Sequence, residues 1–404
     1  MPMSGPPSPP EKPGCSSDSL APLPWWKSRV KLWFLLGTVA LILILVVALV
    51  LCFVVFRPSP PPSIDCPTNI SASIQHVNDY WQKLYPILIP GPESLTWGLS
   101  TYYSGNLAAY NATGIERYYT YALNWATSNN FSLALPNPPR DTADYLGVGY
   151  DYIILYHLDP NHPDHYIQAT DNAIRKIIAS PRNDLWSWVD ALSMAMPHFA
   201  HLGVIRNDTR YFDKMYALYN HTKSAEGGSG LWDPSKGLWW RDKHFIGTDI
   251  YWSRGNGWAI AALAKVLDVL PRWDAHYDEY VSTMRQMGSA LADAQQANGF
   301  WYVDLGNSTD FPGPETSGTM LFVYGIAWGI NHGIFDEATY RPIVAKAWNS
   351  VVNSAIAPDG RLMYVQGPGF APASRQPVTL SSTFDYGLGA FLLGGSELVQ
   401  LCPY

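Results

Sequence analysis

The sequence predicts an all-α protein in which six helical hairpins close into an (α/α)6 barrel, preceded by one transmembrane helix. Three observations indicate this fold. Residues 32–56 contain no charged side chain. Beyond them, apolar residues recur at helical spacing without a convincing period-two strand, and glycines gather in every second helical stretch. A disordered chain is excluded, because 14% of the 404 residues are aromatic and such surface must be buried.

The N-terminal region predicts a membrane anchor. Residues 1–31, rich in Pro and Ser, are expected to be a disordered cytosolic tail. The 25 residues from 32 to 56, at ~1.5 Å each, can cross ~30 Å of hydrocarbon. Lys27, Arg29 and Lys31 precede this run and Arg57 alone flanks its other end. The positive-inside rule therefore predicts a single-pass type II membrane protein with its folded domain extracellular or in the secretory lumen. A cleaved signal peptide is the alternative.

Cysteine and asparagine positions agree with that topology. After the anchor and a linker over 57–65, the chain has two cysteines, Cys66 and Cys402, near the two ends of the folded part. An oxidising lumen favours a disulfide between them, and two free thiols are the alternative. N-x-S/T sequons predict N-glycosylation at Asn69, Asn111, Asn130, Asn207, Asn220 and Asn307.

Residues 66–404 are predicted to form one domain of twelve helices. The even-numbered helices carry glycine pairs that allow close packing, whereas the odd-numbered ones carry a charged face, which predicts six inner and six outer helices. A solenoid of helix pairs is the alternative, although no fixed-length repeat is present. The expected helices are 70–85, 96–110, 115–129, 142–158, 163–179, 187–202, 209–222, 255–269, 277–297, 318–332, 338–355 and 383–400.

Polar and aromatic clusters mark one end of the expected barrel. All inner helices of such a barrel point the same way, so their N-termini meet at one mouth, where the helix dipoles favour an anion. Trp and Tyr rings there would suit the faces of sugars, whereas helix caps and core aromatics are the alternative. The clusters cover residues 140–149, 184–194, 251–258, 314–319 and 381–387.

Two aspartates at this mouth are candidates for acid/base catalysis. Asp190 follows Trp186 and Trp188 near the start of an inner helix. The helix terminus lowers the pKa of this carboxyl group, and indoles that exclude water raise it. A group balanced in this way can release and recover a proton near neutral pH. Asp144 is the expected partner carboxylate, and helix capping is the alternative for both aspartates.

Arginines and aromatics of the same clusters are candidates for substrate binding. A guanidinium between aromatic rings, beside glycines that permit close approach, suits bidentate capture of a carboxylate. Structural ion pairs, surface loops or, for Glu315, a contact with the helix dipole are the alternatives. The predicted substrate-binding residues are Trp188, Arg241, Trp252, Arg254, Trp258 and Glu315.

Other ligand classes are disfavoured. A net charge of −7 makes a broad nucleic-acid footprint improbable. The chain has neither an HExxH motif nor a Walker loop, and its histidines do not show the three or four converging ligands that a metal requires. We therefore expect no cofactor, no metal and no nucleic acid. The expected partners are an acidic oligosaccharide and, through residues 32–56, the membrane.

Three ordered motifs, WSWVDALSMAMPHFAHLG, YWSRGNGWAIAALAKVL and ETSGTMLFVYGIAWGI, resemble glycoside hydrolase family 105. These unsaturated rhamnogalacturonyl hydrolases are akin to the unsaturated glucuronyl hydrolases of family 88. The resemblance spans about residues 70–401 and implies a six-hairpin barrel. It also implies removal of a 4-deoxy-hex-4-enuronosyl group, the product of a lyase, by hydration of its enol-ether double bond.

The resemblance also implies roles for individual residues. Asp190 matches the general acid/base, Asp144 the second carboxylate, and Trp188, Trp252, Arg254 and Trp258 match positions that stack on or grip the uronate. At residues 240–242 the chain reads Trp-Arg-Asp, where rhamnogalacturonyl members carry His-Gly/Ala-Trp/Tyr-Asp. Unsaturated glucuronyl or other uronyl termini therefore stay open. A conventional inverting glycosidase and an anchored, non-catalytic sugar-binding protein are the alternative functions.

Overall fold

The computed structural model describes residues 66–86, 89–134 and 143–403, with a few positions between 36 and 45. The chain divides into two units, Met1–Ser63 and Ile64–Tyr404, and the second holds the helical domain. Apart from those few positions, the predicted tail, anchor and linker lie outside the described residues. Within the described ranges, no helix has both the length and the apolar character that crossing a membrane requires.

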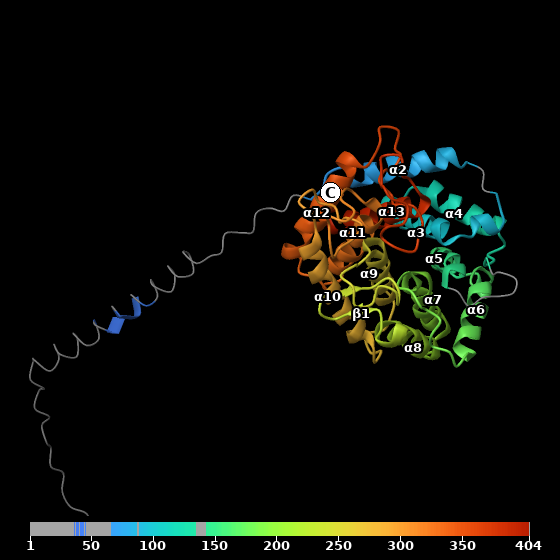
Figure 1. Cartoon of the computed structure of the whole chain (residues 1–404), viewed down its shortest axis with the longest axis horizontal. Coiled ribbons are helices and arrows are strands. Elements are labelled where there is room, and N and C mark those ends of the chain that lie inside the picture. Colours follow the sequence, from blue (N-terminus) through green and yellow to red (C-terminus); the bar gives the residue numbers. More distant parts are fainter. Residues whose placement is uncertain are drawn as a thin grey trace, which may run out of the picture. The chain divides into compact units, whose positions relative to one another are not determined.

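Six helices of the domain form a closed inner ring (Figure 1). Each inner helix contacts the next one, and the last helix, α13, returns to pack on the first, α3. This closure confirms the predicted barrel and excludes the solenoid. The inner helices are α3 (Trp97–Thr113), α5 (Val148–Leu158), α7 (Asp190–Arg206), α9 (Ser253–Leu267), α11 (Thr316–Asn331) and α13 (Asp385–Leu401).

Six outer helices cover this ring, so all twelve predicted helices are confirmed. They are α2 (Ile70–Leu84), α4 (Glu116–Ser128), α6 (Gln168–Ala179), α8 (Arg210–Ser224), α10 (Tyr277–Ala294) and α12 (Glu337–Ser354). The described residues also include short 3₁₀ helices and one antiparallel hairpin between α8 and α9. These are η1 (Pro92–Ser94), η2 (Ala143–Tyr145), η3 (Asp164–Tyr166), η4 (Glu226–Gly228), β1 (Trp232–Asp233) and β2 (Leu238–Trp239).

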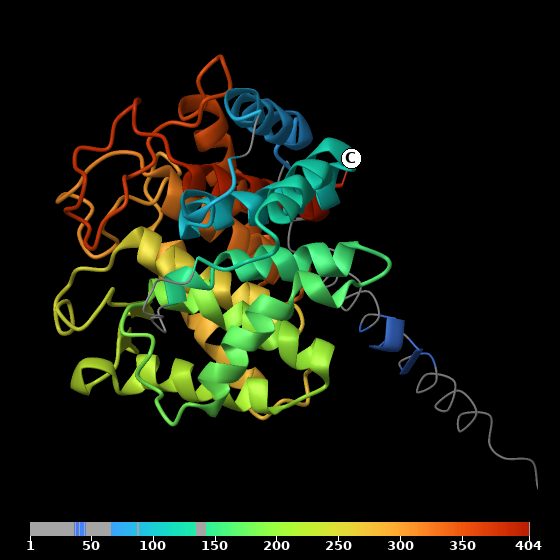
Figure 2. The same ribbon diagram turned by 90° about the vertical axis from the view of Figure 1, so that its right-hand side faces the viewer.

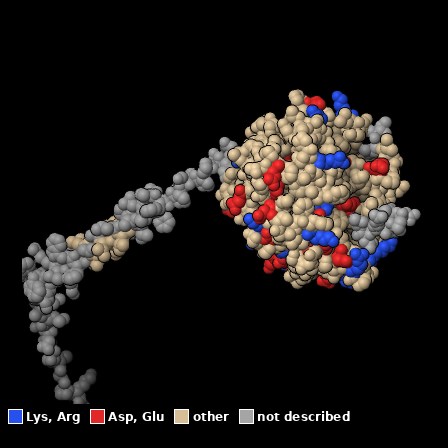
Figure 3. Space-filling view, in the orientation of Figure 1, with Lys and Arg blue, Asp and Glu red and all other residues tan. Residues whose placement is uncertain are grey.

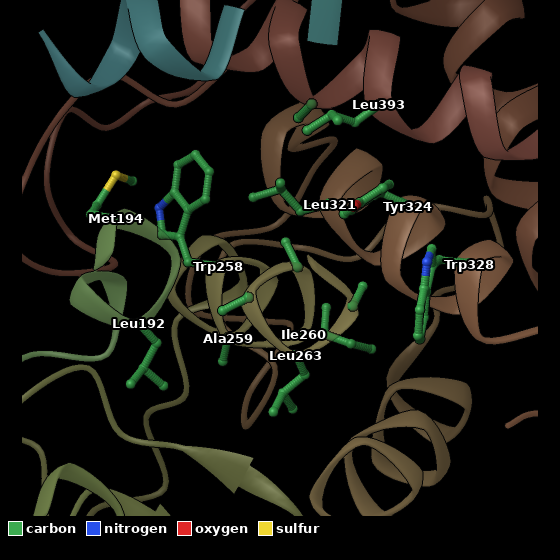
Figure 4. Close-up of a cluster of buried hydrophobic side chains, with 14 of the residues drawn as sticks. Leu192, Met194, Trp258, Ala259, Ile260, Leu263, Leu321, Tyr324, Trp328 and Leu393 are labelled. Atoms are coloured by element: carbon green, nitrogen blue, oxygen red, sulfur yellow. The ribbon is translucent and has the colours of Figure 1, made fainter. Parts of the chain in front are cut away.

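Glycines let the inner helices approach closely. A Cβ atom on Gly105 of α3 would overlap the backbone of Gly389 in α13, and one on Gly257 of α9 would lie 2.8 Å from the Cβ of Leu321 in α11. Figure 4 shows the side chains that fill the space between α7, α9, α11 and α13, among them Ile260. The glycine pattern of the sequence thus reports the inner ring.

Long connections lead into the inner helices and gather at one end of the domain, as the green to red loops of Figure 2 show. They include residues 180–189, 225–252, 295–315 and 355–384. Because each of them precedes the N-terminus of an inner helix, this end is the predicted mouth. On the face shown in Figure 3, acidic and basic side chains are interspersed among uncharged ones.

The predicted disulfide between Cys66 and Cys402 is confirmed, with a Cα–Cα distance of 5.6 Å and a sequence separation of 336. It joins the chain just before α2 to the end of α13. Replacing both cysteines by alanine is expected to lower the free energy of unfolding by about 2–5 kcal/mol, because the unfolded chain loses a long-range constraint. Urea unfolding with and without a reductant measures this effect, and the reductant should leave the double variant unchanged. An equally stable variant would contradict this role.

The six sequon asparagines are exposed. Each side chain lies on the surface of the domain, where a glycan could be attached without disturbing the core. Glycosylation itself stays a prediction. These residues are Asn69, Asn111, Asn130, Asn207, Asn220 and Asn307.

Candidate active site

Asp190 is the first residue of inner helix α7, at the mouth. The two residues before it pair with the segment at Arg241 and Asp242. The backbone N–H of Val189 donates to the carbonyl of Arg241 at 2.8 Å, and Trp188 forms an antiparallel bridge with Asp242. This pairing brings the connection after β2 against the start of α7. Arg241 is thereby held beside Asp190, although 51 residues separate them along the chain.

The guanidinium of Arg241 faces the carboxylate of Asp190. Their closest atoms, Nε and Oδ2, lie 3.3 Å apart, and each side chain is 14% exposed. These two atoms are buried without a hydrogen bond, because the ion pair lacks hydrogen-bond geometry. The other side of the guanidinium donates from Nη1 to Asp242 Oδ2 at 2.8 Å. Asp190 Oδ2 is thus a buried acceptor and Arg241 Nε a buried donor, and neither has a hydrogen-bond partner. Buried polar atoms of this kind are suited to bind a ligand.

Asp144, in η2, lies close enough to Asp190 for the two carboxyl groups to influence each other. Burial and then the negative charge of Asp190 raise the pKa of Asp144 to about 6, against the attraction of Arg241. Burial also raises the pKa of Asp190, while Arg241 and Arg254 oppose the rise. The structure thus brings together the predicted carboxylate pair and raises the pKa of both groups, which is the direction that acid/base catalysis by a carboxyl group requires.

Asp242 keeps Arg241 in position. Burial alone would raise the pKa of Asp242, but hydrogen bonds from Arg241 and His244 hold it below its usual value. Asp242 therefore remains a carboxylate at neutral pH and anchors the guanidinium. Trp188 is half-buried and forms this bridge with Asp242. One of the predicted substrate-binding aromatic residues therefore lies at the mouth.

Arg254 and Trp252 lie beneath the surface of the mouth, each 1% exposed. Arg254 donates from Nη1 to the carbonyl of Gln366 at 2.6 Å and from Nη2 to that of Gly367 at 3.0 Å. Trp252 donates from its indole nitrogen to the Gln366 side chain at 2.8 Å. The two guanidinium nitrogens expected to hold a substrate carboxylate are therefore bonded to backbone carbonyls. Both residues hold the segment that begins at Gln366. The positive charge of Arg254 also opposes the rise in the pKa of Asp190.

Glu315 was predicted to bind substrate, but the structure places it in the interior. Its side chain is fully buried and caps α11, accepting hydrogen bonds from the backbone N–H groups of Ser317 at 3.0 Å and Gly318 at 2.7 Å. A third backbone N–H, from Gln366, donates to the same carboxylate at 3.1 Å. With its oxygens occupied and no exposed surface, Glu315 does not face a ligand. The helix-dipole alternative describes it better.

Trp258 also belongs to the interior. It is 3% exposed, and Figure 4 shows it among apolar side chains that include Met194. Its ring meets that of Trp97 edge-on, with centroids 6.2 Å apart. Trp258 thus supports the floor of the mouth instead of offering a free face to a sugar.

Two groups that the sequence did not single out also lie at the mouth. Gln366 connects Arg254, Trp252 and Glu315, and no local pattern in the sequence marks it. Asp385, the first residue of α13, has its pKa raised to about 6 by burial. Its position within the 381–387 cluster at the start of an inner helix was the available signal.

A separate cavity of about 560 Å³ lies between α2, α3 and α4. Its lining includes the aromatic residues Trp81, Tyr103 and Trp125, the segment before α3, and Asp385. Neither Asp144 nor Asp190 lines it. The cavity is therefore distinct from the carboxylate pair.

Across the described ranges, no group of three or more His, Cys, Asp or Glu side chains has a metal-binding arrangement. The site itself consists of two carboxyl groups of raised pKa beside one guanidinium, at the mouth of a helical barrel. Such a site can transfer protons and hold an anion. These are features of a carbohydrate-processing hydrolase of the six-hairpin type.

Comparison with known proteins supports this class of hydrolase. The model of Glycosyl Hydrolase Family 88 matches residues 72–402. The chain belongs to this family, and it is a glycoside hydrolase. The resemblance to families 105 and 88 noted in the sequence is thus confirmed.

Individual relatives cover most of the chain. An unsaturated 3S-rhamnoglycuronyl hydrolase from Formosa agariphila is 30% identical over 351 residues, 80% of this chain and 88% of the relative. The solved structure of a family 88 glycosyl hydrolase from Bacteroides vulgatus is 32% identical with a TM-score of 0.76, covering 84% and 100% of the two chains. A family 105 glycoside hydrolase of C. acetobutylicum, at 20% identity and TM-score 0.68 over 81% and 99%, shares the fold.

Proposed function

We propose that the protein removes a 4-deoxy-hex-4-enuronosyl group from the non-reducing end of lyase-generated oligosaccharides, with Asp190 as general acid/base. The observation that carries this proposal is the contact of Asp190 with Arg241, at 3.3 Å, inside a largely buried mouth. A carboxyl group of raised pKa supplies the proton, and a guanidinium beside it binds the uronate carboxylate. The relative named for rhamnoglycuronyl hydrolysis makes a rhamnose-linked unsaturated uronate the first substrate to test.

The reaction consumes one water. Asp190 donates its proton to C4, and the C4=C5 electron pair forms the new C–H bond, leaving an oxocarbenium ion shared by C5 and the ring oxygen. Asp190, now a carboxylate, takes a proton from water as the water oxygen bonds to C5. The hemiketal then opens to a C5 ketone, and the resulting C1 hemiacetal collapses to an aldehyde and releases the aglycone alcohol.

Asp144 and Arg241 support these steps. The negative charge of one carboxylate raises the proton affinity of the other, so the pair can keep one proton between them near neutral pH. Arg241 opposes this effect. When a uronate carboxylate occupies the guanidinium, the opposing attraction is partly neutralised, which favours the protonated acid at the moment of binding.

The location of the enzyme is a second part of the proposal. We infer a single-pass type II membrane protein, anchored by residues 32–56, with the catalytic domain in the secretory lumen or outside the cell. The uncharged run, the flanking basic residues, the Cys66–Cys402 disulfide and six exposed sequons support this topology. Protease protection of the tail in sealed cells, together with a mass decrease on deglycosylation, would test it.

The activity is tested with matched substrates. The enol-uronate absorbs in the ultraviolet, so hydration removes its absorbance while the aglycone appears. Unsaturated oligosaccharides should be consumed, and saturated uronosyl oligosaccharides of the same sequence should not. Cleavage of the saturated compounds with anomeric inversion would instead support a conventional glycosidase. Tight binding of the unsaturated compounds without turnover would support a sugar-binding protein.

A further inference from the structure

An exposed aromatic side chain lies beside Arg241, the arginine that contacts Asp190. Phe370 is 77% exposed, and its ring centroid lies 5.6 Å from the guanidinium carbon of Arg241. Arg241 in turn contacts Asp190. A single exposed aromatic is ordinary on a protein surface, so the position of Phe370 over the arginine, and the way its loop is held, decide its meaning.

The loop that carries Phe370, residues 366–377, is anchored at its base by Gln366. The Gln366 carbonyl accepts from Arg254 and from the Tyr386 hydroxyl, both at 2.6 Å. Its side-chain oxygen accepts from Trp252 at 2.8 Å. Gln366 and Arg254 are themselves buried. Two of the residues that the sequence predicted as substrate contacts, Arg254 and Trp252, thus hold the base of this loop.

The tip of the loop is also fixed. The Gln366 side-chain nitrogen donates to the carbonyls of Pro372 and Ser374, each at 2.8 Å. The hydroxyl oxygen of Ser374 accepts from the backbone N–H groups of Phe370 and Ala371, each at 3.2 Å. A buried amide therefore crosses the loop from base to tip. This network holds an apolar ring in solvent, above the arginine, at a defined position.

We propose that Phe370 is the platform on which the first aglycone sugar stacks, the pyranose directly linked to the unsaturated uronate. This inference rests on the proposed function. In a uronate whose carboxylate binds Arg241, C1 is joined through the ring oxygen to C5, the carbon that bears this carboxylate. The sugar linked at C1 therefore lies next to the guanidinium, where Phe370 is found. The C–H face of the next pyranose is apolar and packs on an aromatic ring. Phe370 thereby becomes a determinant of aglycone specificity.

Two substrates separate this role from others. One is an unsaturated uronyl disaccharide, and the other is the methyl glycoside of the same unsaturated uronate, which has no sugar to stack. For Phe370→Ala we expect the ratio of kcat/KM between disaccharide and methyl glycoside to fall roughly three- to tenfold, mainly through the KM of the disaccharide. Phe370→Tyr keeps the ring and should restore the wild-type ratio.

Trp273→Ala is the matched control. Trp273 is 70% exposed and lies in the connection after the C-terminus of α9, at the end of the barrel opposite the mouth. This variant should leave the ratio unchanged. An unchanged ratio in Phe370→Ala, with both substrates affected equally or not at all, would overturn the platform. Wild-type protein that consumes neither substrate would instead refute the proposed function, so the two failures are distinguishable.

Discussion

Asp190→Asn should reduce turnover of an unsaturated uronyl substrate by about 10²–10⁴-fold, the usual contribution of a positioned general acid/base. The amide keeps the shape of the side chain but cannot give a proton to C4 or take one from water. Loss of ultraviolet absorbance during incubation with lyase-generated oligosaccharides measures the effect. Binding should survive, because Arg241 remains, and KM should change far less than kcat.

Asp184→Asn is the control for this experiment. Asp184 lies in the same connection, is 53% exposed and pairs with Arg182 at the surface, so its neutralisation should leave kcat near that of the wild type. Both variants should give native circular dichroism and a cooperative thermal transition. Substantial turnover in folded Asp190→Asn would remove Asp190 from its role.

Arg241→Gln is expected to lower kcat/KM by about 10²-fold or more, in keeping with the ~2–5 kcal/mol that truncation of a buried charge pair costs. The substrate carboxylate loses its guanidinium, and Asp190 loses the charge that faces it. Steady-state kinetics over a range of pH measures both consequences.

The same variant should change the pH profile in a defined direction. Arg241 lowers the pKa of both Asp144 and Asp190, so its removal raises both pKa values. The protonated acid then persists to higher pH, and the descending limb of kcat should move upward in pH. Arg241→Lys keeps a charge but not the two-pronged geometry. It should therefore retain most of the wild-type profile with a raised KM. A descending limb that stays in place or moves downward in Arg241→Gln would contradict the role given to the guanidinium.

Much of the fold was predictable, because the physics that forms it is local and periodic. Helical apolar spacing gives the twelve helices, and glycines such as Gly105 and Gly389 mark helices that touch backbone to backbone. The direction of inner helices places Asp190 at the mouth, and the cysteine count outside the anchor leaves Cys66 one partner. None of these inferences requires knowledge of how a distant loop folds.

The surroundings of three predicted binding residues depend on such a loop. An arginine next to a tryptophan is typical of a ligand-binding site, which is why Arg254 and Trp252 were predicted to bind substrate. In the structure, Gln366 of the 366–377 loop accepts hydrogen bonds from both. Glu315 could be a free carboxylate or a cap, and its burial against Gln366 decides for the cap. Since more than 50 residues separate Gln366 from each of these partners, sequence spacing did not reveal the network. For the same reason, the sequence did not predict that Phe370 lies beside Arg241.

The proton that Asp190 is proposed to deliver to C4 can be followed directly. The wild-type enzyme should be incubated with an unsaturated uronyl disaccharide in D₂O while the product is observed by NMR at early times. Hydration of the double bond predicts one deuteron, added to one face of C4, in step with loss of the alkene signal and release of the aglycone. Release of the aglycone with the C4=C5 bond intact would show attack at the anomeric carbon and contradict the mechanism.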